Sequence, residues 1–399
     1  MGYPFDLPAS MPSPGGAGWN VPLEANLGGL RDRARIHEST YGVPLDSFDG
    51  ADDDAKLGAA MAYAAAQTRP PAIILGNSAY SFSGGPYPYY PGLRLVGSLG
   101  HTEREFQTTG PHTVVTVGGS ALFSVPSGGV RSLYISGIQF RAASGSVHFQ
   151  QPVTDLSSGP IIQDGNWERC GWVGFNTVMH ARHLRCSIER TYCNNSTDTP
   201  FKLAGADNYY WTTGQSYLSS TAQSASSFYV WFTHMSKSIV GPIFITPERA
   251  TAVRIDGSFG GLVFQGTIFD SANRTATTAC QGAAVLITGG RGMVFRDCWF
   301  YNNCVNPSAT GRSPVDKGQV YIRGSAADIL FNGCSWSGEI SGQGWYVPAG
   351  TPAIYAATGV TGVKVVAPIA PNNGPKLLQH QQAGIITRYA ADDWTLAVA

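Results

Sequence analysis

Two Glu-Arg pairs carry the carboxylates whose spacing best suits glycoside chemistry. Glu168-Arg169 and Glu189-Arg190 occupy the same place in two successive copies of a short repeat. If those copies stack, the carboxyl groups of Glu168 and Glu189 lie about 5 Å apart, which is the separation that retaining glycosidases use. The alternative is a solvent-exposed ladder of Glu and Arg side chains, because surface ion pairs of this kind contribute little to stability.

Asp270 and Asp297 form a second candidate catalytic pair. They lie one repeat apart but at different places in the unit, which predicts a wider gap, closer to inverting geometry. The alternative is that both are solvated turn residues. No metal or cofactor is predicted, because His180 and His183 would meet only on a helix and their run has the pattern of a strand. The Gly-Gly-Arg-Gly run at 289–292 lacks the strand-to-helix context of a phosphate loop.

Aromatic residues are concentrated in the longest irregular interval, residues 205–236. Five of them are predicted to bind glycan: Tyr209, Tyr210, Trp211, Tyr229 and Trp231. Aromatic faces stack on the apolar faces of sugar rings, while phenol and indole tips form hydrogen bonds. The alternative is that these side chains pack a loop against the body of the protein or against another subunit.

A repeat of the form apolar-x-x-(Cys/Thr/Ile)-x-(Phe/Trp/Cys) would position all of these residues. Six copies begin at Ile135, Trp167, Ile188, Phe264, Phe295 and Phe331, and a looser copy spans Ile239–Phe244. The uneven period and the short alternating segments indicate a β-solenoid. We predict an all-β, right-handed parallel β-helix over residues 72–366. Three fourth-position cysteines, Cys170, Cys298 and Cys334, are predicted to form a column of thiols in its core.

The flanking segments differ from the repeats in composition. Residues 1–40 are rich in Pro and Gly and predict an extended arm that orders against a partner. In the entry segment 41–71, Asp52, Asp53 and Asp54 precede an Ala-rich stretch, which predicts a helix that caps the open end of the solenoid. Prolines interrupt the strand pattern after residue 366, so residues 367–399 are expected to form a separate C-terminal tail.

The charge balance and the hydropathy exclude several classes of partner. The chain has 26 basic and 26 acidic side chains and no basic block, so no nucleic-acid partner is expected. No apolar run approaches the roughly 20 residues that span a bilayer, so no membrane insertion is expected. Residues 1–8 lack the basic and apolar regions of a secretory signal peptide, so synthesis in a cytoplasm without such a signal is expected.

The start of the predicted solenoid resembles a known superfamily. The run Phe48-Asp-Gly-Ala-Asp-Asp-Asp54 and the following helix resemble the entry to pectate-lyase-like β-helix proteins. So do three short segments, Ile73–Leu75, Ala79–Phe82 and Gly92–Gly97. Within that superfamily the chain is most similar to bacteriophage tail spikes and minor tail proteins, and Gly18–Asn26 resembles their virion-attachment segments.

That resemblance implies an assembly and a location. It implies a homotrimer of side-by-side β-helices on the phage virion, joined to other tail proteins through the N-terminal arm and facing a host cell-surface glycan. Such a protein would be made in the host cytoplasm and leave it at lysis. No cluster of Asp with nearby Lys and Arg matches the calcium and catalytic constellation of pectate lyases, so lyase activity is not implied.

Three functions follow from these observations. The favoured one is a receptor-binding tail protein that adheres to a host glycan. The second is a polysaccharide depolymerase, a glycoside hydrolase using Glu168 and Glu189 or Asp270 and Asp297. The third is a purely structural tail component without a ligand.

Overall fold

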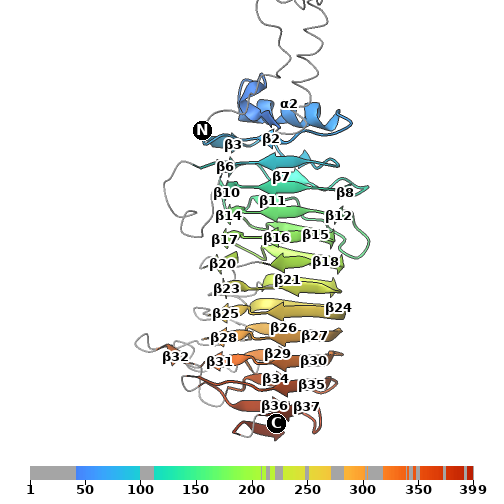
Figure 1. The fold of residues 1–399 in the computed structure, drawn as a ribbon, viewed down its shortest axis with the longest axis vertical. Helices are drawn as coiled ribbons and strands as arrows, with labels where there is room; N and C mark the ends of the chain where they lie inside the picture. Colours follow the sequence, from blue (N-terminus) through green and yellow to red (C-terminus); the bar gives the residue numbers. More distant parts are fainter. Residues whose placement is uncertain are drawn as a thin grey trace, which may run out of the picture.

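Short parallel strands stacked in successive coils make up the body of the protein, as the computed structural model shows (Figure 1). The structure describes residues 42–98, 112–207, 209–212, 216–220, 228–247, 251–270, 283–301, 303, 318–337, 339–340, 345–346, 351–371, 374–390 and 393–398. The prediction of a right-handed parallel β-helix is confirmed. The predicted arm at residues 1–40 lies outside the described residues.

Most coils contribute one strand to each of three parallel sheets. Sheet I contains β1 (Val43–Pro44), β2 (Ile73–Ile74), β5 (Arg94–Val96), β9 (Tyr134–Ser136), β13 (Asn166–Glu168), β16 (Ser187–Glu189), β19 (Tyr210–Thr212), β22 (Ser238–Val240), the second half of β24 (Thr251–Gln265), β27 (Arg291–Arg296), β30 (Ala327–Asn332), β35 (Thr361–Val366) and β37 (Ile386–Tyr389). Sheet II contains β3 (Ala79–Phe82), β6 (Val114–Val117), β10 (Gln139–Ala142), β14 (Gly171–Val173), β17 (Tyr192–Asn194), β20 (Ser216–Ser220), β23 (Ile243–Pro247), β25 (Ile268–Asp270), β28 (Trp299–Tyr301) and β31 (Ser335–Ser337).

Sheet III completes the coil and carries the groove described below. It contains β8 (Val130–Arg131), β12 (Ile161–Gln163), β15 (Met179–Leu184), β18 (Phe201–Asp207), β21 (Phe228–Met235), the first half of β24, β26 (Val285–Ile287), β29 (Val320–Ile322), β34 (Ile354–Ala356), β36 (Leu377–His380) and β38 (Thr395–Val398). The remaining elements are a small parallel sheet of β4 (Tyr87–Pro88), β7 (Ala121–Ser124) and β11 (His148–Gln150), an antiparallel pair of β32 (Glu339–Ile340) and β33 (Trp345–Tyr346), the 3-10 turn η1 (Leu45–Ser47) and the helix α2 (Asp53–Ala65).

In the described part of the chain, two corners of many coils turn through a left-handed residue. At the corner from sheet I to sheet II the positive φ falls on the third position of the repeat, as in Gly137, Arg169, Arg190, Gly266, Asp297 and Gly333. At the corner from sheet III to sheet I it falls on residues such as Ser132, Asp164, Arg185 and Asp328. Variation in length is concentrated at the third corner, from sheet II to sheet III, which is short at 174–178 and long at 302–319. The uneven period of the sequence therefore arises mainly at one corner.

The core is a set of ladders of identical or similar side chains. Phe264, Phe295 and Phe331 are fully buried, and their ring centroids stack at 4.8 and 4.7 Å. Cys170, Cys298 and Cys334 are buried at the fourth position, as predicted, but only Cys298 and Cys334 are on adjacent coils, since Thr191 and Thr267 are among the residues that separate them from Cys170. Each Sγ donates a hydrogen bond to the carbonyl of the first-position residue of the preceding coil, at 3.3, 3.5 and 3.3 Å respectively. The cysteines in the described part of the chain are free thiols.

Helix α2 covers the first coil, as the acidic triplet predicted (Figure 1). Asp52 caps the helix, accepting a hydrogen bond from the Ala55 amide at 2.8 Å. Asp53 and Asp54 instead reach β3, the first strand of sheet II, and accept hydrogen bonds from the Ser81 and Ser83 amides at 2.8 Å each. These carboxylates satisfy amides that no strand pairs with, so the triplet closes the edge of the solenoid.

The strand assignments correct three expectations from the sequence. The looser copy was placed one residue early, because Val240 aligns with Phe264 and Ile245 with Phe269. The interval after Ile188 contains a full additional coil, in which Trp211 and Leu218 take the first and sixth positions at a spacing of seven rather than five. Residues 367–399 do not form a separate tail, because β36, β37 and β38 pair in parallel with the coils before them.

One polar side chain in the core predicts an acid-sensitive fold. His183 on β15 points inward, stacks on Trp167 with centroids 5.3 Å apart, and has no hydrogen-bond partner for either ring nitrogen among the described residues. Burial lowers the pKa of His183 from 6.5 to about 3. The unfolded chain therefore takes up this proton first as the pH falls, so stability decreases from about pH 6.5 down to about pH 3.

Replacing His183 with phenylalanine is expected to raise the free energy of unfolding at pH 7 by about 1–3 kcal/mol, because an unsatisfied buried polar group is removed. It should also reduce the loss of stability between pH 6.5 and pH 4.5. Urea unfolding at the two pH values measures both effects, with the exposed His234→Phe as the control. An unchanged pH dependence in His183→Phe would show that this imidazole is not the acid-sensitive group.

Candidate functional site

A column of four polar or aromatic side chains lines the outer face of sheet III. His180 on β15 is in register with Lys202 on β18, Lys202 with Trp231 on β21, and Trp231 with Arg254 on β24. In β15 the buried residues alternate with partly exposed ones, so His180 faces outward and His183 faces the core. The two histidines are therefore on opposite faces of one strand and do not form a common metal site.

The Trp231 ring lies between two cations. The Lys202 ammonium is 3.7 Å and the Arg254 guanidinium carbon 4.4 Å from the ring centroid, each from a neighbouring strand. Trp231 donates from Nε1 to Asp256 at 2.7 Å, and Arg254 donates to the same carboxylate at 2.6 Å. Thr288 donates to Asp256 at 2.7 Å. Asp256 thus accepts hydrogen bonds from three side chains, and both the indole and the guanidinium are held in place.

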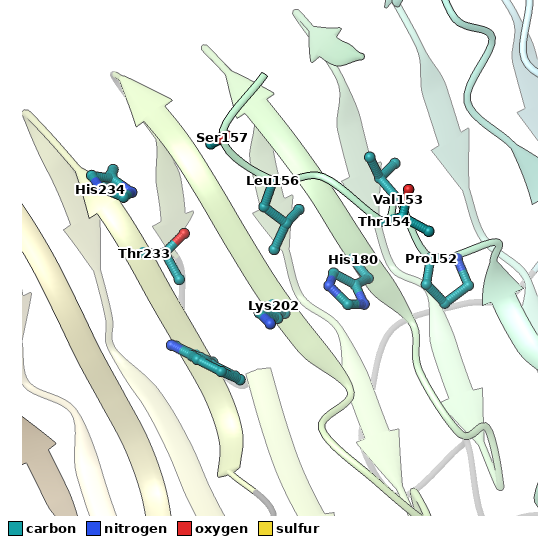
Figure 2. A pocket seen from close by; sticks show the side chains of 10 residues that line it. Pro152, Val153, Thr154, Leu156, Ser157, His180, Lys202, Thr233 and His234 are labelled. Atoms are coloured by element: carbon teal, nitrogen blue, oxygen red, sulfur yellow. The ribbon is translucent and has the colours of Figure 1, made fainter. Parts of the chain in front are cut away.

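The segment 151–160 forms a wall over this column. Figure 2 shows Val153, Thr154, Leu156 and Ser157 crossing the strands that carry His180 and Lys202. The Val153 amide donates to the His180 carbonyl at 3.0 Å, and the Arg182 guanidinium donates to the Gly159 carbonyl at 3.1 Å. An open pocket of about 500 Å³ lies between this wall and the strands, lined by Leu156, His180, Lys202, Trp231 and His234 among others.

Asp155 stiffens the wall from within. Its carboxylate accepts hydrogen bonds from the amide and hydroxyl of Ser157, at 2.8 and 2.6 Å, and from the hydroxyl of Ser158. The hydrogen bonds from Ser157 and Ser158 hold the pKa of Asp155 well below its usual range. This carboxylate is turned into its own loop, so the loop presents a fixed shape to the pocket.

Burial and the neighbouring cation decide the protonation of His180. Burial, with the charge of Lys202 next, lowers the pKa of His180 to about 4. Burial also lowers the pKa of Lys202, while Asp256 and Asp198 oppose that shift. Near neutral pH the imidazole of His180 is therefore uncharged, and it offers one hydrogen-bond donor and one acceptor to a ligand.

A second pocket lies on the other side of the wall. It also measures about 500 Å³ and is lined by Arg131, Ser158, Gly159, Gln163 and Arg182, among others. Arg131 is in register with Gln163, and Ile161 with Arg182, so this pocket continues along the same face of sheet III toward α2. Together the two pockets form a groove, which we call the sheet III groove, with the segment 151–160 across its middle.

Glu168 and Glu189 lie elsewhere, on the outer face of sheet I. They are in register on β13 and β16, as the repeat predicted. Glu168 accepts a hydrogen bond from the Tyr134 hydroxyl at 2.8 Å and lies 3.4 Å from the Arg169 guanidinium. Glu168 therefore takes part in a surface network, which agrees with the alternative of a Glu/Arg ladder.

The structure does not bring Asp270 and Asp297 together. Asp297 is the left-handed residue of a corner and aligns with Gly266, whereas Asp270 ends β25 and aligns with Tyr301. Three residues separate Gly266 from Asp270, so the two aspartates stand at different places of adjacent coils, one on a corner and the other at the end of a sheet II strand. A positive φ is several times more common for Asp than for most residues, so the fold itself accounts for Asp297.

Three of the five aromatic residues predicted to bind glycan are in the core. Tyr209, Trp211 and Tyr229 are fully buried, because their interval continues the coil and does not form a surface loop. The prediction that they contact a glycan is wrong for these three. Tyr210 is 44 % exposed on sheet I, and Trp231 lies in the sheet III groove.

The sequence did not single out Lys202, Arg254, Arg131 or Arg182, although the structure places all four at the groove. Their spacings along the chain are uneven because each pair is separated by a different corner from sheet II to sheet III. The available signal was local: each is a polar residue at an outward position of a short alternating strand. Among the described residues, no three His, Cys, Asp or Glu side chains gather as metal ligands.

No helix in the described part of the chain is long and apolar enough to cross a bilayer. By its coils, the protein is a parallel β-helix. No protein-family model and no curated protein matches the chain.

Three solved structures illustrate the likeness in fold. The A-module of the Azotobacter vinelandii mannuronan C-5 epimerase AlgE4 is 12 % identical, with 87 % of this chain and 100 % of that chain covered and a TM-score of 0.49. Tailspike protein 3 of bacteriophage CBA120 is 10 % identical, with 93 % and 61 % covered and a TM-score of 0.38. The endo-xylogalacturonan hydrolase of Aspergillus tubingensis is 12 % identical, with 88 % and 96 % covered and a TM-score of 0.35. At these identities the likeness concerns the fold alone.

Proposed function

We propose that this protein binds a host-surface polysaccharide in the sheet III groove, as a receptor-binding component of a bacteriophage tail. The groove carries this proposal, because it combines an indole, fixed cations and a neutral imidazole on a rigid surface that is open along the coil axis. A long open groove suits a polymer, and a few convergent polar groups supply specificity. The placement in a phage tail rests on the resemblance to tail spikes, which includes the segment Gly18–Asn26, and trimeric assembly and attachment through residues 1–40 are parts of the same proposal.

Binding is favoured over cleavage at this groove by the chemistry of its lining. None of the described residues that line either pocket is an aspartate or a glutamate. Glycoside hydrolysis requires a pair of carboxyl groups flanking the bond that breaks. Of the nearby carboxylates, Asp155 and Asp256 are already held by neighbouring donors and act as positioning residues, and Asp198 lines neither pocket.

Depolymerisation is the second candidate function, and the register of Glu168 and Glu189 favours it. Parallel strands bring residues in register to about 4.8 Å, close to the separation in retaining enzymes. The hydrolase would then act on sheet I and not in the groove.

Replacing Trp231 with alanine is expected to weaken polysaccharide binding about tenfold, or about 1.4 kcal/mol. The indole separates Lys202 from Arg254 and donates to Asp256, so its loss frees Lys202 and removes the ring face from Arg254, which stays paired with Asp256. Biolayer interferometry against immobilised host-envelope polysaccharide measures the affinity. Trp299→Ala is the matched control, because Trp299 is a 52 % exposed tryptophan on sheet II.

The same protein variants, incubated with the same polysaccharide, also distinguish a depolymerase from an adhesin. New reducing ends that disappear in Glu168→Gln and persist in Trp231→Ala would identify a depolymerase on sheet I. Binding without new reducing ends supports the adhesin. Equal weakening in Trp231→Ala and Trp299→Ala would contradict the assignment of the groove as the binding surface.

A further inference from the structure

The cations of the sheet III groove form a diagonal line along the solenoid. Arg131 lies on β8, Arg182 on β15, Lys202 on β18 and Arg254 on β24, and each stands at an outward position of its strand. The register places β8, β12, β15, β18, β21 and β24 on successive coils. At about 4.8 Å per coil the line from Arg131 to Arg254 is on the order of 24 Å long.

Three of these four cations lack a carboxylate partner within the part of the chain that the structure describes. Arg254 pairs with Asp256 at 2.6 Å, whereas Arg131, Arg182 and Lys202 form no such ion pair. Arg182 donates to the Gly159 carbonyl, and the Lys202 ammonium lies 3.7 Å from the centroid of the Trp231 ring, with Asp256 and Asp198 nearby but not in an ion pair with it among the described residues. Burial of the Lys202 ammonium is costly and is only partly offset by the charges of Asp256 and Asp198, so an anionic ligand in direct contact would offset more of that cost.

The wall at 151–160 divides the line into two subsites. Ser157 lines the pocket that contains Lys202, and Ser158 lines the pocket that contains Arg131 and Arg182. Arg131 and Lys202 are three coils apart, about 14 Å along the axis. A single small anion cannot reach both side chains, but an extended chain with an acidic group on its repeating unit can.

We propose that the ligand of the sheet III groove is an anionic polysaccharide, whose acidic groups bind Lys202 on one side of the wall and Arg131 with Arg182 on the other. This inference rests on the proposed function and specifies its ligand class. Carboxylate and sulfate groups both satisfy the chemistry, because each accepts charge-assisted hydrogen bonds from ammonium and guanidinium donors.

Two matched pairs of probes test the charge of the ligand. Oligogalacturonate is compared with its methyl ester, and dextran sulfate with dextran, by titration calorimetry on the full chain. The acidic member of at least one pair should bind at least about tenfold more tightly than its neutral counterpart, and its affinity should fall as salt is raised. Preference for one pair identifies the acidic group as carboxylate or sulfate, and both outcomes support the inference.

Charge-removing variants test the two subsites. Lys202→Gln and Arg131→Gln should each weaken binding of the acidic hexasaccharide about tenfold, because each removes a hydrogen bond to a charged group. A hexasaccharide of the preferred acidic glycan should bind more tightly than a disaccharide of the same glycan. Arg131→Gln should reduce the ratio of these two affinities. Arg94→Gln and Lys364→Gln are the controls, since both remove exposed cations from the outer face of sheet I and should leave affinity unchanged.

Three results would overturn the inference. If the controls weaken binding as much as Lys202→Gln, the attraction is diffuse and there are no subsites. If neutral and acidic glycans bind equally and Lys202→Gln has no effect, the glycan-binding function remains but its ligand is not selected by charge. If no glycan of either kind binds, the proposed function fails together with this inference.

Discussion

Phe295→Ala is expected to lower the free energy of unfolding by about 3–5 kcal/mol, the usual cost of emptying a phenylalanine site in a packed core. Phe295 is the middle ring of three, stacked on Phe264 and Phe331 with centroids 4.8 and 4.7 Å away, and it also contacts Phe269 and Phe300. Neighbouring rings are held by the backbone ladders above and below, so the cavity cannot collapse.

Urea unfolding followed by fluorescence and circular dichroism measures this effect. Trp299→Ala is the control, because that residue is 52 % exposed on the outer face of the neighbouring strand β28. The control should change stability by less than about 0.5 kcal/mol. A loss below about 1 kcal/mol in Phe295→Ala would mean that the ladder of rings does not stabilise these coils.

Gly290→Ala is expected to cost about 3 kcal/mol or more and to reduce the yield of folded protein. Gly290 has a φ of +87°, and a Cβ at this position would lie 2.1 Å from the Ser258 amide nitrogen of the preceding coil. The contact is with backbone, so the coils themselves must move apart. The glycine-rich run at 289–292 therefore serves the close approach of two coils.

Gly260→Ala separates the steric clash with the preceding coil from the backbone strain of a positive φ. Gly260 also has a positive φ, of +113°, but a Cβ there would meet no atom within 4 Å. Its substitution carries conformational strain alone, of about 1–2 kcal/mol. The thermal midpoint of each variant measures the difference. Equal losses in the two alanine variants would show that the close approach at Gly290 contributes nothing.

The inner face of the coil could be predicted from the sequence because its signal is local. Alternation within three to six residues decides which side chains point inward, and the single-residue corner fixes the spacing from first to sixth position. Cys170, Cys298 and Cys334 were found in this way. The coil with Trp211 and Leu218 was missed because its spacing is seven, so its buried aromatic residues were assigned to a surface loop.

The groove could not be predicted in the same way, because it depends on register between distant strands. Lys202, Trp231 and Arg254 are neighbours only when the corners between them are counted correctly, and those corners differ in length. The Glu168 and Glu189 alignment was predicted because the stretch between them is short and both belong to recognisable repeats. Their network with Tyr134 and Arg169 was not predicted, since Tyr134 lies on the preceding coil.

The concentration of length variation at one corner makes this scaffold suitable for engineering. A residue inserted at Arg169 or Asp164 would shift the register of every later strand in that coil. The connection between β11 and β12, by contrast, already contains the ten residues 151–160 without disturbing the stack. Grafted segments placed at that connection would border the groove directly. Ligand preference could thus be exchanged by transplanting one loop, while the supporting coils stay unchanged.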